Sequence, residues 1–277
     1  MRITKLLFSI VTLGVILSSC LGSDDNTIEV KTPTFAYIQS YNNSLIAAVA
    51  GINNMYITSK TLSYSASHDD CVFVTFKTQH GATSNGIYGV EITSITEPLL
   101  QEPIVKVSEM PVLENQVYPT SFSVKTFHPQ IFLGDRWLFN ATFNLKDEEI
   151  VEPRFFYNTD NQIEYDYEGN PRPVDKNQGI IDVRFVIVNP NENEETTKKT
   201  VIRNDIVGDF SNLRVDKFLP LDEKPTSSVS VNFPLKFRYT KLSFDSRGDE
   251  ILQTEIIGSW NTSTSTSYGI TFVANEY

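Results

Sequence analysis

The sequence predicts an all-β protein, and three observations carry this prediction. Two long tracts, Val229 to Tyr239 and Trp137 to Leu145, alternate apolar with polar residues. A strand places such apolar side chains on one face, whereas a helix would scatter them around its circumference. Turn residues such as Asn85-Gly86 and Arg247-Gly248 recur between short apolar runs. No helix-length window shows a convincing repeat of 3.6 residues, so a parallel α/β fold is excluded and a sandwich or barrel of short antiparallel strands is favoured.

The first nineteen residues form a secretory signal. Arg2 and Lys5 give a positive start, Leu6 to Leu17 is an almost unbroken apolar stretch, and Leu17-Ser18-Ser19-Cys20 closes it. The stretch is too short for a membrane-spanning helix, which needs about 18 or more apolar residues. The closing quartet resembles the lipobox of bacterial lipoproteins. This resemblance implies that Cys20 becomes the diacylated first residue of the mature chain and anchors it to a membrane.

Residues 20–32 are predicted to be a flexible acidic tether. Its start, Leu21 to Asn26 (LGSDDN), resembles the Ser/Asp-rich surface-export signal of Bacteroidetes-type lipoproteins, which implies a lipid-anchored protein on the outer face of the outer membrane. A plain spacer is the alternative. The formal net charge of −11 disfavours nucleic-acid binding and electrostatic docking on anionic lipid, because both need clustered Lys and Arg. Membrane attachment is therefore expected to come from the lipid alone.

The remaining strand predictions follow from apolar alternation bounded by turn residues. Cys71 begins one such run and is expected to be a small buried side chain rather than a reactive thiol. Pro234 within the Val229 to Tyr239 tract predicts an edge position or a bulge, because proline lacks the amide that a central ladder needs. The further predicted strands are Phe35–Gln39, Leu45–Val49, Val72–Thr78, Ile87–Ile95, Phe122–Phe127, Val151–Tyr157, Ile180–Val188, Leu213–Phe218, Ile251–Trp260 and Tyr268–Val273.

A domain boundary is predicted near Glu97 to Pro103, where two prolines bracket a short polar interval. The runs Asp70 to Phe76 and Asn85 to Ile95 before it, and Ile131 to Asn140 after it, resemble NigD-like lipoproteins. That resemblance implies a small N-terminal OB-type barrel over residues 33–98 and a C-terminal antiparallel β-sandwich over residues 104–277, with Ile131 to Asn140 as the sandwich's opening strand. The family takes its name from a bacteriocin locus, so the resemblance implies no defined activity.

The search for catalytic chemistry is negative. The three histidines, His68, His80 and His128, lack the spacing of a zinc site, and no nucleophile elbow, P-loop or dinucleotide fingerprint occurs. Glu164 and Asp166 are paired only in sequence and are expected to be solvated. The oxygen-rich stretch around them lacks the EF-hand pattern of a calcium site. We therefore predict a non-catalytic protein with no metal and no cofactor.

Three tyrosines are the candidate contact residues for a partner. Tyr157, Tyr165 and Tyr167 are interpreted as residues of a polar, turn-rich insertion, where their rings are expected to be partly exposed. Exposed tyrosines on loops are adaptable contacts for glycans or proteins. The alternative is that these tyrosines pack across strands of a hairpin.

Two functions from different classes remain open. One is a surface lipoprotein that binds a protein or glycan partner through loops of its β domains. The other is a structural or adhesin-type, fimbria-like subunit that exchanges a terminal strand such as Tyr268–Val273 between chains. A bacteriocin-locus-associated protein is a further alternative, which comes from the resemblance.

Overall fold

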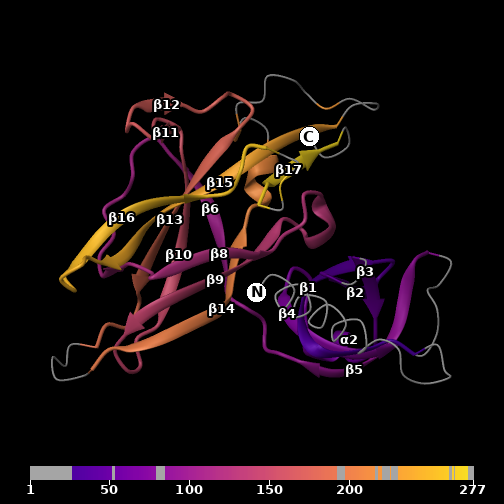
Figure 1. The fold of residues 1–277 in the computed structure, drawn as a ribbon. Coiled ribbons are helices and arrows are strands. Elements are labelled where there is room, and N and C mark those ends of the chain that lie inside the picture. The colour runs from indigo at the N-terminus through magenta and orange to yellow at the C-terminus, as the bar shows by residue number, and fades with distance from the viewer. Residues whose placement is uncertain are drawn as a thin grey trace, which may run out of the picture. The chain divides into compact units, whose positions relative to one another are not determined.

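The chain divides into two units between Pro98 and Leu99, inside the segment where the sequence predicts a boundary. Figure 1 shows both units in the computed structural model. The structure describes residues 27–51, 54–78, 85–191, 197–215, 218–219, 225, 230–261, 264 and 266–273.

The first unit is a closed five-stranded barrel with the strand order β1-β2-β3-β5-β4. The β3 and β5 strands pair in parallel, and a short helix, α2, lies between β3 and β4 in the chain. This is the strand order of an OB fold, so the OB-type barrel is confirmed. Its elements are β1 (Glu29–Tyr41), β2 (Ser44–Val49), β3 (Met55–Thr58), α2 (Leu62–Ser65), β4 (Cys71–Thr78) and β5 (Ile87–Ile95).

Alternation of side chains fills the barrel interior. Cys71, at the start of β4, is fully buried, as the sequence predicts. The β1 strand begins at Glu29, and the buried Val30 pairs with Phe76 of β4. Residues 29–32 therefore belong to the barrel, and the predicted tether is shorter than 20–32. The residues buried together are Val30, Ala36, Ile38, Ala47, Val49, Met55, Ile57, Leu62, Val72, Val74 and Phe76.

The second unit contains the remaining strands and two 3-10 turns (Figure 1). Its elements are β6 (Gln101–Val107), β7 (Gln116–Val117), β8 (Ser121–Thr126), η1 (Ile131–Leu133), β9 (Arg136–Leu145), β10 (Val151–Asn158), β11 (Ile163–Tyr165), β12 (Pro171–Pro173), β13 (Gly179–Ile187), β14 (Lys199–Asp209), η2 (Ser211–Arg214), β15 (Val231–Phe244), β16 (Glu250–Ile257) and β17 (Tyr268–Phe272).

These strands form two layers joined by β6. One end of β6 pairs with β14, and the first layer continues from β14 to β9 and β8. The other end of β6 pairs with β10, and the second layer continues from β10 to β13, β15 and β16. Aromatic rings fill the space between the layers: the Phe139 ring on β9 lies 5.3 Å from Phe155 on β10 and 5.2 Å from Phe237 on β15, centroid to centroid. The first pair is tilted and the second is edge-on; ring contacts at these distances are typical of the core between two packed sheets.

The strand directions differ from the antiparallel prediction. The β6/β10, β6/β14 and β13/β15 pairs are parallel, so the sandwich is mixed. Pro103 was expected to end the polar interval between the two domains, but it lies in β6, where that strand changes partner from β14 to β10. Pro234 was expected at an edge or a bulge. It pairs with Gly269 of β17 on one side, and the pairing of β15 with β13 begins only at the next residue, Leu235. The proline therefore lies where β15 has a ladder partner on one side among the described strands, which agrees with an edge position.

Three further predictions of local structure are wrong. The β6 and β14 strands are absent from the predicted set, because their apolar residues are interrupted by charges and their burial is uneven. The segment predicted as the strand Leu213–Phe218 starts instead in the 3-10 turn η2. The predicted opening strand Ile131 to Asn140 begins as the 3-10 turn η1, and only its second half belongs to β9, which three strands precede.

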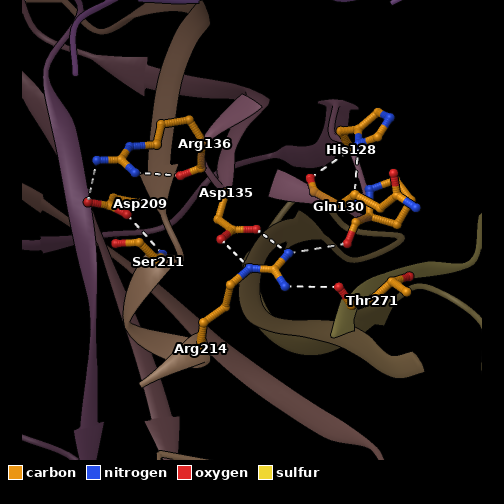
Figure 2. A network of polar contacts seen from close by, with 10 residues as sticks. His128, Gln130, Asp135, Arg136, Asp209, Ser211, Arg214 and Thr271 are labelled. Carbon is orange, nitrogen blue, oxygen red and sulfur yellow. Dashed lines mark hydrogen bonds and ion pairs between the residues drawn. The ribbon is translucent and has the colours of Figure 1, made fainter. Parts of the chain in front are cut away.

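A buried ion pair ties this turn to η2 and the last strand (Figure 2). Gly134 and Asp135 both adopt left-handed backbone conformations, with φ of 58° and 59°. The Arg214 guanidinium donates to both Asp135 oxygens at 2.6 and 2.9 Å, and also to the carbonyls of Thr271 and Pro129 at 2.9 and 3.4 Å. Because these three residues supply four acceptor atoms, Arg214 tolerates burial, and its bond to Thr271 fixes β17.

Candidate functional site

A cleft opens on the outer face of the β13/β15 layer, where two parallel strands part. These strands pair only as far as Val183 and Tyr239, because β7 takes β15's place beside Phe185 and Val186 of β13. The cleft has a volume of about 210 Å³. We call it the hairpin cleft; it is lined by Asn161, Tyr165, Asp182, Arg184, Arg238, Tyr239, Thr240 and Thr254.

Strand alternation explains why polar side chains line it. Val183 on β13 and Phe237 on β15 point into the aromatic core. Their neighbours along each strand, Arg184 and Arg238, therefore point to the opposite face. Thr240 on β15 lies directly opposite Thr254 on β16, so the two hydroxyl side chains share one face of the sheet.

The β11–β12 hairpin is fixed against this face (Figure 1). Arg238 binds both carboxylate oxygens of Asp182 at 2.6 and 2.8 Å, and it also donates to the carbonyls of Ile163 and Asn161 at 3.1 and 2.9 Å. Arg238 and Asp182 are only 8% and 3% exposed. The buried guanidinium is thus satisfied by four acceptors and anchors the hairpin rather than a ligand.

A second contact fixes the hairpin at Glu164. One carboxylate oxygen accepts from Lys236 Nζ at 2.6 Å, and the other accepts from Trp260 Nε1 at 2.6 Å. The same Lys236 nitrogen lies 4.3 Å from the centre of the Trp260 ring. Glu164 was expected to be a solvated carboxylate, but it cross-links the hairpin to the sheet through two different side chains.

Tyr165 ends the β11 strand and projects from this fixed hairpin. It is 67% exposed and lines the hairpin cleft, whereas Tyr167, in the turn beyond it, is 93% exposed and is not one of the lining residues. The turn is held by Asp166, whose carboxylate accepts from the backbone N–H groups of Asn170 and Glu168. The Asn170 N–H, more than any other contact, lowers the pKa of Asp166. Both tyrosines are accessible, as their use as contact residues requires.

Tyr157 does not belong to this group. It lies on β10, which continues to Asn158, and alternation places its side chain beside Phe155 in the core. The side chain is 2% exposed, and this burial raises the pKa of Tyr157 to about 12. The prediction that it forms part of an exposed insertion is therefore wrong. The residue lines a separate cavity of about 290 Å³ together with Lys106, Gln162 and the 174–178 segment.

Arg184 carries the uncompensated charge of the hairpin cleft. On the neighbouring strand β10, Arg154 lies directly opposite Arg184. Arg154 is neutralised by Glu152 at 2.8 Å and Glu102 at 3.2 Å, and Arg238 is neutralised by Asp182. Among the residues that the structure describes, Arg184 has no such partner, and it is half-buried. The cleft therefore presents one guanidinium, two hydroxyls and an aromatic ring to whatever enters it.

Sequence reasoning identified Tyr165 but missed Arg184, Thr240 and Thr254. The available signal was the pair of charges in Ile180-Ile181-Asp182-Val183-Arg184, which marks a polar face within an otherwise buried strand. Cys20, the predicted lipidation site, lies outside the described residues. Within the described ranges, no group of three or more His, Cys, Asp or Glu side chains is arranged to hold a metal ion.

Comparison with known proteins identifies the fold only. No protein-family model and no curated protein matches the sequence. An uncharacterised protein from Parabacteroides merdae superposes with a TM-score of 0.55 at 13% identity, covering 88% of this chain and 99% of that one. A candidate lipoprotein from Bacteroides fragilis gives a TM-score of 0.49 at 8% identity, covering 81% of this chain and 96% of that one. The all-β fold of this chain is thus similar to that of the Parabacteroides merdae protein.

Among the described residues, no helix has both the length and the apolar character to cross a membrane.

Proposed function

We propose that this chain is a non-catalytic lipoprotein, anchored by Cys20 to the outer membrane and exposed at the cell surface, which binds a protein or glycan partner through the hairpin cleft. The signal and lipobox-like quartet, the acidic export-like tether and the resemblance to NigD-like lipoproteins support the location. The observation that carries the binding role is Tyr165, an exposed aromatic side chain at the wall of a polar cleft, on a hairpin that Arg238 and Glu164 hold rigid.

A rigid support matters because binding costs the entropy of ordering every mobile group at the interface. Tyrosine has few rotatable bonds and a large amphipathic ring, so it provides contact area at low entropic cost. The hairpin carries its tyrosine already ordered, since Gln162 also pairs with the backbone of Ile180 in both directions, at 2.7 and 3.0 Å. Preorganisation of this kind is typical of a binding site.

The strand-exchanging subunit remains the alternative proposal. The β17 strand pairs with β15 of the same chain from Val231/Phe272 to Leu235/Tyr268, and this internal pairing favours the binding function. Concentration-dependent sizing separates the two: a monomer supports binding, and concentration-dependent oligomers that disappear when β17 is deleted support strand exchange.

The binding function is tested with the purified membrane-extracted protein on glycan arrays and in cross-linking to surface proteins of its own cells. Tyr165→Ala should abolish the signal. Tyr64→Ala is the matched control, because Tyr64 is 87% exposed on the barrel unit, far along the chain from the hairpin. Equal signals from Tyr165→Ala and the unsubstituted protein would exclude the hairpin cleft as the site. Incorporation of a labelled fatty acid, and its loss in Cys20→Ala, tests the anchor.

A further inference from the structure

We infer that the hairpin cleft binds a sugar residue that carries a single carboxylate, with Arg184 as the carboxylate ligand. This inference rests on the proposed binding function and specifies the ligand class of the same site. Four observations lead to it: the unpaired charge of Arg184, the saturation of its neighbours, the hydroxyl pair, and the tyrosine at the wall.

The first step is the charge. A half-buried guanidinium is costly to leave without a partner, because its N–H donors lose water on entering the cleft. Arg154 on β10 and Arg238 on β15, the two strands that flank β13, each have carboxylate partners. Arg184 alone of these three lacks one among the described residues. A planar guanidinium fork matches a carboxylate in two parallel hydrogen bonds, so a ligand carboxylate would complete the arrangement.

The second step limits the ligand to one anionic group. Arg238 lines the same cleft, but its donors are occupied by Asp182 and by two backbone carbonyls. Only one guanidinium is therefore free to bind an anion. The chain as a whole has a formal charge of −11, which repels polyanions at long range. A ligand with one carboxylate gains the short-range contact with Arg184 and is repelled only weakly by the net negative charge. A nucleic acid or a heavily sulfated polymer is repelled strongly.

The third step concerns the uncharged part of the ligand. Thr240 and Thr254 lie opposite each other on neighbouring strands, and each hydroxyl can both donate and accept. No side-chain hydrogen bond engages either hydroxyl within the described residues. A sugar ring has alternating hydroxyls that match such a pair. The Tyr165 ring, exposed at the wall of the cleft, offers an apolar face to the C–H face of the sugar.

The test is calorimetric or NMR titration of the membrane-extracted protein with methyl glycosides of glucuronic and galacturonic acid and with their neutral parents, glucose and galactose. We expect the acidic glycosides to bind about tenfold or more tightly than the neutral ones, since a charged hydrogen-bonded pair contributes at least one factor of ten. Arg184→Gln should remove this difference and leave the weak neutral binding. Arg184→Lys should retain part of the preference for the acidic glycosides, because lysine keeps the positive charge but not the planar fork. Arg172→Gln is the matched control: Arg172 lies on the same hairpin, is paired with Asp166 and does not line the cleft.

Several results would overturn the inference. These are equal affinity for acidic and neutral sugars, an acidic preference that survives Arg184→Gln, and tighter binding of acetylated aspartyl or glutamyl peptides than of the acidic glycosides. If no sugar binds while a protein partner is lost in Tyr165→Ala, the inference fails and the proposed function stands. If Tyr165→Ala changes no binding at all, the proposed function itself fails. Unchanged tryptophan emission in each variant shows that the fold is retained.

Discussion

Replacing Asp135 by asparagine tests the role of the buried ion pair in the second unit. Asparagine has nearly the same size and tolerates the left-handed backbone at this position, where φ is 59°. The variant removes the charge but keeps the shape. Arg214 then stays buried, at 8% exposure, and keeps the Thr271 and Pro129 carbonyls as acceptors, but it loses the counter-charge of Asp135. Breaking one side of a buried pair costs about 3–5 kcal/mol, which is a large part of the roughly 5–15 kcal/mol that stabilises a typical domain.

Urea unfolding followed by tryptophan fluorescence measures this loss selectively. The chain has two tryptophans, Trp137 and Trp260, and both follow Pro98. The emission therefore reports on the second unit alone. With a slope of about 2 kcal/mol per molar urea, the expected loss lowers the midpoint by about 1.5–2.5 M.

The double variant Asp135→Asn/Arg214→Met separates charge burial from packing. Replacing both partners of a buried pair by uncharged groups is often neutral, so the double variant should be more stable than Asp135→Asn alone. A shift of less than about 0.5 M in Asp135→Asn, or a double variant that loses the sum of both single losses, would refute the reasoning.

Three further predictions concern single contacts. The hydrogen bond from Tyr239 lowers the pKa of Glu255. Its stabilisation is therefore complete above the ordinary pKa of 4.5 and is lost as the pH falls through the lower folded pKa. Glu255→Gln should lower the urea midpoint at pH 7, and the difference from the unsubstituted protein should shrink steadily as the pH falls below 4.5. Gly208→Ala would place a Cβ 2.8 Å from the nearest of three phenylalanine rings and should lower the free energy of unfolding by about 1–3 kcal/mol, as measured by thermal melts. Gly89→Ala is the control: nothing lies within 4 Å of the added Cβ, so no steric loss of stability is expected. Glu164→Gln should speed hydrogen exchange of the hairpin amides, and unchanged protection there would contradict the cross-link.

Several elements of the fold follow from local sequence because their signal is local. The alternation from Trp137 to Leu145 repeats within a single strand, so β9 could be placed from that tract alone. The β14 strand could not, since Lys199–Asp209 mixes exposed charges with a short buried end, and only pairing with β9 over nine positions makes it a strand. Leu213 has an apolar neighbour pattern like that of a strand, but the buried pair at Arg214 holds the segment in a 3-10 turn.

The hairpin cleft shows the same division. Its tyrosine was visible in sequence because turn residues surround Tyr165 and predict an exposed loop. Arg184, Thr240 and Thr254 were not, because they come from three separate strands and meet only where β13 and β15 part around β7. Tyr157 already ended the predicted strand Val151–Tyr157, and the period of two that places Phe155 in the core also turns the Tyr157 side chain inward.

By itself, the sequence determined the properties that depend on short windows: a leader-like start, the strand class and the predicted exposure of the hairpin tip. Tertiary structure alone decided which strands are parallel and which carboxylates pair with the buried arginines. It also decided that the Arg184 guanidinium has no carboxylate partner among the described residues. The physical reason is the distance along the chain over which each effect acts. Hydrophobic alternation can be recognised within a few neighbouring residues, whereas the pairing of charges depends on residues more than fifty positions apart, such as Asp182 and Arg238.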